Sequence, residues 1–186
     1  MVRKIVQSKE PSLRQKSKPV AGIDKKVLDI IRDLKDTLAV QKEPEGVGLA
    51  APQIGKNVRI FVCDYKDFQR VVVNPKVLEI GEIDKKPHSG MKTLRDKASR
   101  GKKEILEGCL SLPNYYGPLK RADKVTLKYL NEKGKEIEEA FEGFNAQIIL
   151  HEIDHLEGVL FLDRLFEQKQ PLYKVTGDEW EEVELG

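Results

Sequence analysis

The sequence predicts a single α+β domain in which β-strands pack around a central buried helix. Three observations predict this fold: an amphipathic helical pattern over residues 24–40, several short β-rich runs, and a helical segment at 144–156 that is apolar almost all round. A chain of 186 residues, 39% of them hydrophobic, has the usual size of one domain with one core. We therefore expect residues 1–186 to form one unit.

The segment 24–40 begins at Asp24, a suitable N-cap, and its apolar residues recur at helical spacing until residues 43–44 end the pattern. Short β-rich runs follow at 58–63, 70–73 and 76–80. A hairpin is predicted from 124–130 through a turn at 131–134 to a second run ending near Phe141. The helix at 144–156 should stop at Gly158. Further short strands are expected at 159–162 and 179–185.

Charge and composition exclude several classes of protein. Lys and Arg number 33 and Asp and Glu 31, a net charge of +2, so the chain has no general footprint of a DNA-binding protein. No apolar run approaches the ~20 residues that span a bilayer, and the start of the chain lacks the apolar core of a signal peptide. Two cysteines suit a reducing compartment. We expect a cytoplasmic protein without a membrane partner.

Two segments have a local charge bias. Residues 81–104 hold eight Lys or Arg and four acids, which predicts a charged, solvated insertion, with contact to RNA or another anionic surface as the alternative. Residues 178–186 carry five acids and no base and form an acidic tail.

The strongest chemical signal is the motif H-E-x-x-H, formed by His151, Glu152 and His155 on the buried helix. At 3.6 residues per turn the two imidazoles lie one above the other and can hold one metal ion, with Glu152 beside them to handle a proton. Two core histidines satisfied by hydrogen bonds are the structural alternative. Burying this many polar groups is costly without a compensating ion, which favours the metal site.

A catalytic metal needs a third protein ligand and an open position. Phe161 stands where a metzincin protease has its third histidine, so that class is disfavoured. His88 lies in the charged insertion and Cys63 ends an apolar run, which indicates a solvated imidazole and a buried thiol. Cys109, between Gly108 and a Ser-Leu-Pro segment, is equally well read as a ligand or as a core thiol. A downstream acid also remains open.

The segment 46–55, GVGLAAPQIG, is rich in glycine and alanine. Small residues permit close approach of a ligand or another backbone, and Gln53 offers an amide donor beside them. A tight turn between a helix and a strand is the plainer interpretation. The segment lacks the Lys-Ser/Thr of a phosphate loop and is no dinucleotide fingerprint.

Taken together, three segments resemble the peptide deformylase family. GVGLAAPQ at 46–53, EGCLS at 107–111 and HEIDHLEG at 151–158 occur in the family's order, and flanking similarity extends from near residue 5 to about 165. The chain departs from the family pattern in two ways. Leu150 stands where the third motif usually begins with Gln, and the charged insertion is longer than the family usually carries.

The resemblance implies a metal-dependent hydrolase that removes the formyl group from the initiator methionine of new polypeptides and releases formate. It implies that Cys109, His151 and His155 bind one divalent ion, Fe(II) in many members and replaceable by Ni, Co or Zn. Glu152 would move protons, while Gln53 and the backbone N–H of Leu110 would stabilise the developing oxyanion.

For the substrate, the resemblance implies a methionine pocket and strand-like pairing with the peptide backbone. The residues it assigns are Val47, Gly48, Gly108, Phe144 and Ile148. Glu107 and Arg121 resemble an ion pair that steadies the loop of Cys109. The expected partners are N-formylmethionyl nascent peptides and, transiently, the ribosome. A metallopeptidase and a metal-holding protein that binds nascent chains without turnover are the rival functions.

Overall fold

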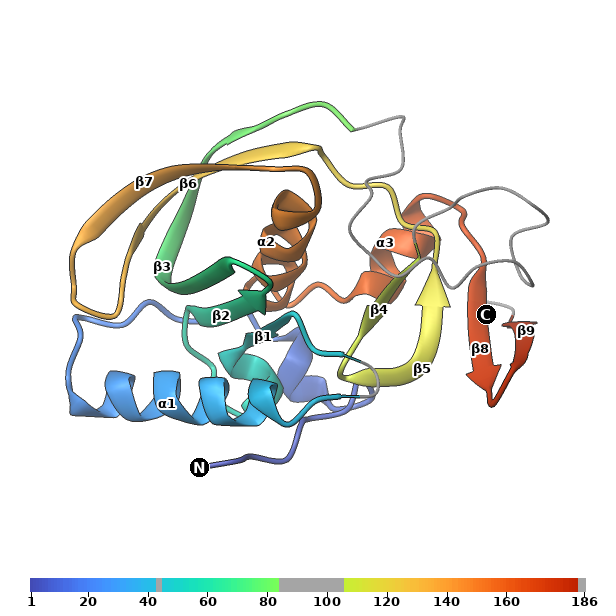
Figure 1. Cartoon of the computed structure of the whole chain (residues 1–186), viewed down its shortest axis with the longest axis horizontal. Helices are drawn as coiled ribbons and strands as arrows, with labels where there is room; N and C mark the ends of the chain where they lie inside the picture. Colours follow the sequence, from blue (N-terminus) through green and yellow to red (C-terminus); the bar gives the residue numbers. More distant parts are fainter. Residues whose placement is uncertain (43–44, 84–105, 184–186) are drawn as a thin grey trace.

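The structure, a computed structural model, describes residues 1–42, 45–83 and 106–183 (Figure 1). Its helices are α1 (Lys25–Ala39), α2 (Gly143–Leu156) and α3 (Phe161–Glu167). Its strands are β1 (Gly48–Ala50), β2 (Ile60–Tyr65), β3 (Phe68–Ile80), β4 (Glu107–Cys109), β5 (Leu112–Gly117), β6 (Lys124–Leu130), β7 (Glu136–Glu142), β8 (Leu172–Thr176) and β9 (Glu179–Val183). Short 3₁₀ helices cover Pro11–Arg14 and Ala51–Ile54. No helix within the described ranges is long and apolar enough to cross a membrane.

The strands form two antiparallel sheets, one in the order β1-β2-β3-β6-β7 and one in the order β4-β5-β8-β9. Helix α1 covers one face of the larger sheet, and α2 lies against the other face (Figure 1). Alternation along β2 produces this arrangement, because successive side chains of a strand point to opposite faces. Ile60 and Val62 pack with α1, whereas Phe61 and Cys63 pack with α2. The predicted α+β domain around a buried helix is confirmed.

The predicted helices at 24–40 and 144–156 are confirmed as α1 and α2. Asp24 caps α1, since its carboxylate accepts a hydrogen bond from the N–H of Val27 at 2.8 Å. The predicted hairpin is confirmed as β6 and β7, which pair from Lys124↔Glu142 to Leu130↔Glu136.

The strand predictions need three corrections. The runs at 70–73 and 76–80 belong to one strand, β3, which passes Asn74 at φ 51° with a register shift against β6. The strand predicted at 159–162 is wrong, because α3 begins at Phe161. Asp163 accepts a hydrogen bond from the Leu160 N–H at 2.7 Å and so closes the first turn of that helix. Strands β1, β4, β5 and β8 were not predicted.

Two predictions extend past the described residues. Of the charged insertion 81–104, only residues 81–83 are described, and His88 lies outside the described ranges. Of the acidic tail, residues 179–183 form β9 as expected from the run at 179–185, while residues 184–186 lie outside.

Gly158 follows the end of α2 as predicted, with φ of 74°, a left-handed conformation that favours glycine. A Cβ there would lie 2.5 Å from the backbone oxygen of Arg14, so the N-terminal segment packs directly on this turn. Gly177, in the turn between β8 and β9, has φ of 59° and no neighbour within 4 Å of an added Cβ.

The first prediction separates backbone strain from crowding at these two glycines. Gly177→Ala adds only left-handed strain and should lower the free energy of unfolding by about 1 kcal/mol. Gly158→Ala adds strain and a clash with backbone, and should cost about 3 kcal/mol. Denaturant unfolding of both variants measures the difference, and equal losses would contradict the packing described for Gly158.

Candidate metal centre and active site

Cys109, His151 and His155 come together although they belong to different elements. Cys109 ends β4, and the two histidines lie one turn apart on α2. Their ligand atoms all lie within 4.8 Å of one another, and the Cys109 Sγ is 3.3 Å from His155 Nε2. Among the candidates that the structure describes, Cys109 is therefore the one that joins the two histidines.

The other described candidate, Cys63, is not at this site. It is 3% exposed and packs in the core between the larger sheet and α2, and burial raises the pKa of its thiol well above the usual value. The prediction of a buried structural thiol is confirmed. Phe161 is also buried, in the core cluster beside Cys109.

The residues present fit a metal ion. One thiolate and two imidazoles form a donor set typical of Zn(II), Fe(II) and their neighbours. His155 turns Nε2 toward the Cys109 Sγ, and Glu152 Oε2 beside them is buried without a hydrogen-bond partner among the described residues. Buried polar atoms are nearly always satisfied, so the unpaired carboxylate oxygen indicates that a further polar group belongs beside it in the folded protein.

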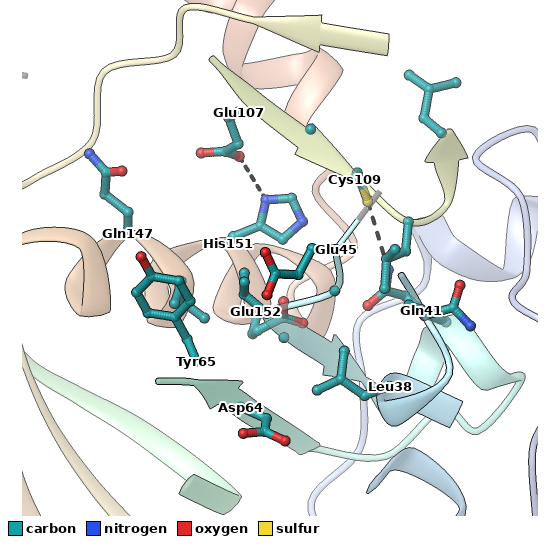
Figure 2. Close-up of a pocket in the computed structure, with 18 of the residues that line it drawn as sticks. Leu38, Gln41, Glu45, Asp64, Tyr65, Glu107, Cys109, Gln147, His151 and Glu152 are labelled. Carbon is teal, nitrogen blue, oxygen red and sulfur yellow. Dashed lines mark hydrogen bonds and ion pairs between the residues drawn. The ribbon is translucent and has the colours of Figure 1, made fainter. Parts of the chain in front are cut away.

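His151 is oriented by Glu107, whose Oε1 accepts a hydrogen bond from His151 Nδ1 at 2.7 Å (Figure 2). This bond leaves Nε2 as the nitrogen that His151 presents to a metal. The ion pair expected between Glu107 and Arg121 is also present, in a bidentate form with two distances of 2.7 Å. Burial would raise the pKa of Glu107, but Arg121 and His151 outweigh it and hold that pKa well below the usual range.

Glu152 lies against the smallest residue of β1. A Cβ on Gly48 would fall 2.5 Å from Glu152 Oε1, so only glycine leaves room for the carboxylate. Burial raises the pKa of Glu152 to about 7, and the charge on His151 opposes that shift. The carboxyl group can therefore hold or release a proton near neutral pH.

Gln53 lies in the 3₁₀ helix Ala51–Ile54, and three contacts fix its side-chain amide. Its Oε1 accepts from the Ala50 N–H at 2.9 Å, and its Nε2 donates to Ser111 Oγ at 3.1 Å and faces Cys109 Sγ at 3.7 Å. The second N–H of the amide therefore points toward the metal cluster with only a long contact to sulfur. Ser111 is a partner that sequence reasoning did not single out.

A cavity of about 1120 Å³ opens beside the cluster. Of the predicted site residues, it is lined by Val47, Gly48, Gln53, Gly108, Cys109, Leu110, Phe144, Ile148, His151 and Glu152. His155 is buried behind them. Tyr65 and Gln147 line the same cavity, on the side away from Cys109 (Figure 2), and were not predicted.

Two further residues missed by sequence reasoning join the ion pair of Arg121. Asp154, inside the H-E-x-x-H motif, accepts from Arg121 Nη1 at 2.8 Å and from Arg164 Nη2 at 2.7 Å. The position of Asp154 on an apolar helix signals that it needs a buried partner. Nothing local to Arg164 reveals that it is one.

This fold and this site assign the chain to the metal-dependent hydrolases that carry H-E-x-x-H on a buried helix. The sequence model of the polypeptide deformylase family matches residues 2–171. The chain belongs to the peptide deformylase family, and its activity is the removal of the N-formyl group from nascent peptides.

Similar proteins cover nearly all of the chain. A peptide deformylase of Pseudothermotoga lettingae is 40% identical over 88% of this chain and 82% of its own length. Peptide deformylase 2 of Clostridium acetobutylicum is 39% identical over 89% of this chain and 97% of its own. The crystal structure of the Thermotoga maritima enzyme matches with a TM-score of 0.72 at 34% identity, over 88% of this chain and 97% of that one. A structure from Acinetobacter baumannii with Met-Ala-Ser bound matches with a TM-score of 0.72 at 29% identity, over 88% and 98% of the two chains.

The second prediction distinguishes the two cysteines. Cys109→Ser removes the sulfur that lies beside the two histidines. The variant should bind no nickel and release no formate, because a serine hydroxyl is a poor ligand for such an ion. Cys63→Ser, in the core, should keep both. Metal analysis and activity after anaerobic reconstitution with nickel measure the difference, and equal losses in the two variants would refute the assignment.

Proposed function

We propose that the chain hydrolyses the formamide of N-formylmethionyl peptides with one divalent ion, Fe(II), held by Cys109, His151 and His155, and with Ni, Co or Zn able to substitute. Such an ion would supply Lewis-acid chemistry, polarising the carbonyl and favouring loss of a proton from water. Two neutral imidazoles and one thiolate would leave a net charge of +1 at the ion. The observation that carries the proposal is the clustering of these three groups at the wall of the cavity.

We assign the proton transfers to Glu152. Glu152 is 3% exposed and lines the cavity, and one oxygen of its carboxyl group has no partner among the described residues. It would accept a proton from the attacking water and deliver it to the leaving amine. The contact with Gly48 supports this role, because the absence of a side chain there leaves space for the carboxylate beside the cavity.

Gln53 Nε2 and the backbone N–H of Leu110 are the proposed oxyanion donors. Donors held in place before the reaction stabilise the charge that develops on the formyl oxygen at little reorganisation cost. Gln53 meets this condition, since its contacts to Ala50 and Ser111 fix the amide while one N–H faces the cluster. Formyl carbon bears only hydrogen, so a narrow site would admit it and exclude an ordinary peptide carbonyl.

The topology supports substrate binding as an added strand. β1 is the edge of the five-stranded sheet and β4 the edge of the four-stranded sheet, and both border the cavity. An extended peptide between them could pair with the backbone of Val47, Gly48 and Gly108. The methionine side chain would then enter the apolar part of the cavity formed by Phe144 and Ile148. The Met-Ala-Ser bound to the similar Acinetobacter protein supports a short peptide as the ligand.

We place the protein in the cytoplasm, in transient contact with the ribosome, because its substrates are nascent chains. The rival metallopeptidase reading lacks support, since Phe161 is buried in the core and is no ligand. One assay tests the proposal against both rivals. Formyl-Met-Ala-Ser should release formate while an unblocked peptide stays intact. Cleavage of the unblocked peptide would favour a peptidase, and no turnover by metal-loaded protein would favour a binding protein.

The third prediction concerns Glu152. Glu152→Gln should leave metal content near that of the wild type and reduce formate release by roughly 10²–10⁴-fold, the usual worth of general acid–base catalysis. Glu157→Gln is the matched control. It lies on the turn after α2, paired with Arg59 and Lys16, and should keep full activity. Retained turnover in Glu152→Gln at full metal occupancy would contradict the role.

A further inference from the structure

Asp154 is an acid buried on the metal-site helix and paired with two arginines from different elements. It is 6% exposed. Arg164, on α3, contacts both of its oxygens, with Nη2 at 2.7 Å from Oδ1 and Nε at 3.2 Å from Oδ2. Arg121, between β5 and β6, reaches the second oxygen at 2.8 Å.

These contacts form a continuous path from α3 to a metal ligand. Arg121 donates a hydrogen bond from Nη1 to Asp154 and two more, from Nε and Nη2, to Glu107. Glu107 in turn accepts from His151 Nδ1. The order of the path is Arg164, Asp154, Arg121, Glu107, His151, and no donor nitrogen of Arg121 is left without a partner.

Within this path, two carboxylates, Glu107 and Asp154, face two guanidinium groups, Arg121 and Arg164. Arg164 also pairs through Nη1 with Glu167 at 3.0 Å, but that carboxylate is exposed to water and lies outside the path. Without Arg164, one guanidinium would serve two buried carboxylates. An uncompensated buried charge is costly, so Asp154 would draw Arg121 away from its bidentate position on Glu107.

We propose that Arg164 is a positioning residue for the metal ligand His151, acting through Asp154, Arg121 and Glu107. Because Arg164 neutralises Asp154, Arg121 keeps both of its hydrogen bonds to Glu107. Glu107 then stays in place to accept the hydrogen bond from His151 Nδ1. The partners behind a metal ligand govern how firmly that ligand holds its ion. This inference rests on the proposed ligand set, since it requires that His151 bind the metal.

Arg59, just before β2, provides a matched control whose partner lies at the end of the same helix. Its Nη1 lies 2.6 Å from Glu157 Oε1 at the end of α2, so it too forms an ion pair that ties this region to the rest of the fold. Its path does not reach Cys109, His151 or His155. A variant of Arg59 therefore measures the effect of losing an ion pair while the contacts that hold the metal ligand His151 stay intact.

The fourth prediction is the test, in which nickel-loaded protein is mixed with a chromogenic chelator and the rate of metal release is followed. Arg164→Met should release nickel about tenfold faster than the wild type. Arg164→Lys keeps the charge but not the two-point contact and should fall between the two. Arg59→Met should release nickel at the wild-type rate, even where its melting temperature drops as much as that of Arg164→Met.

A rescue variant tests the charge argument itself. Adding Asp154→Asn to Arg164→Met removes the unpaired carboxylate, while the amide oxygen can still accept from Arg121, so slow release should return. Release from Arg164→Met that matches Arg59→Met, or a double variant that loses metal faster still, would overturn the role of Arg164 and leave the proposed function intact. A wild-type protein that holds no nickel would instead overturn the ligand set, and this inference with it.

Discussion

The burial of charge on one apolar helix constrains the rest of this structure. Helix α2 carries His151, Glu152, Asp154 and His155 in a segment that is otherwise core. Each of these groups loses water on folding, and the loss is tolerable only if each finds a partner. Asp154 finds two arginines and His151 finds Glu107, while His155 and Glu152 keep atoms without partners. A metal ion bound at the imidazole Nε2 atoms and a water or substrate beside Glu152 would compensate for part of this loss.

The two sheets serve the same constraint from different sides. The five-stranded sheet covers the apolar face of α2 and brings Gly48, at its edge, against Glu152. The four-stranded sheet carries Cys109 at the end of its edge strand. The site therefore lies where two sheet edges meet over one helix. An edge strand offers backbone groups that another chain can pair with, and here both edge strands border the cavity in which an extended peptide would bind.

The sequence pattern predicted those elements and residues that depend on neighbours within a few positions of the chain. Helix α1, the hairpin β6–β7 and the motif on α2 follow from periodicity, turns and spacing within a few residues. The strand at 159–162 was wrong because a short apolar run does not distinguish strand from helix, and the cap at Asp163 decided it. The residue pattern left Cys109 open and missed Arg164, because their roles come from contacts with residues far away in the sequence.

Leu150 shows how the same constraint absorbs a departure from the family pattern. The family usually has Gln immediately before the first histidine, and an amide there would need polar contacts. In this chain Leu150 is half-buried and packs against the apolar cluster between α2 and the larger sheet. An apolar side chain at that place leaves no donor or acceptor to satisfy. The orientation of His151 depends on Glu107, from β4, so this substitution lies outside the path that holds the ligand and leaves the donor set unchanged.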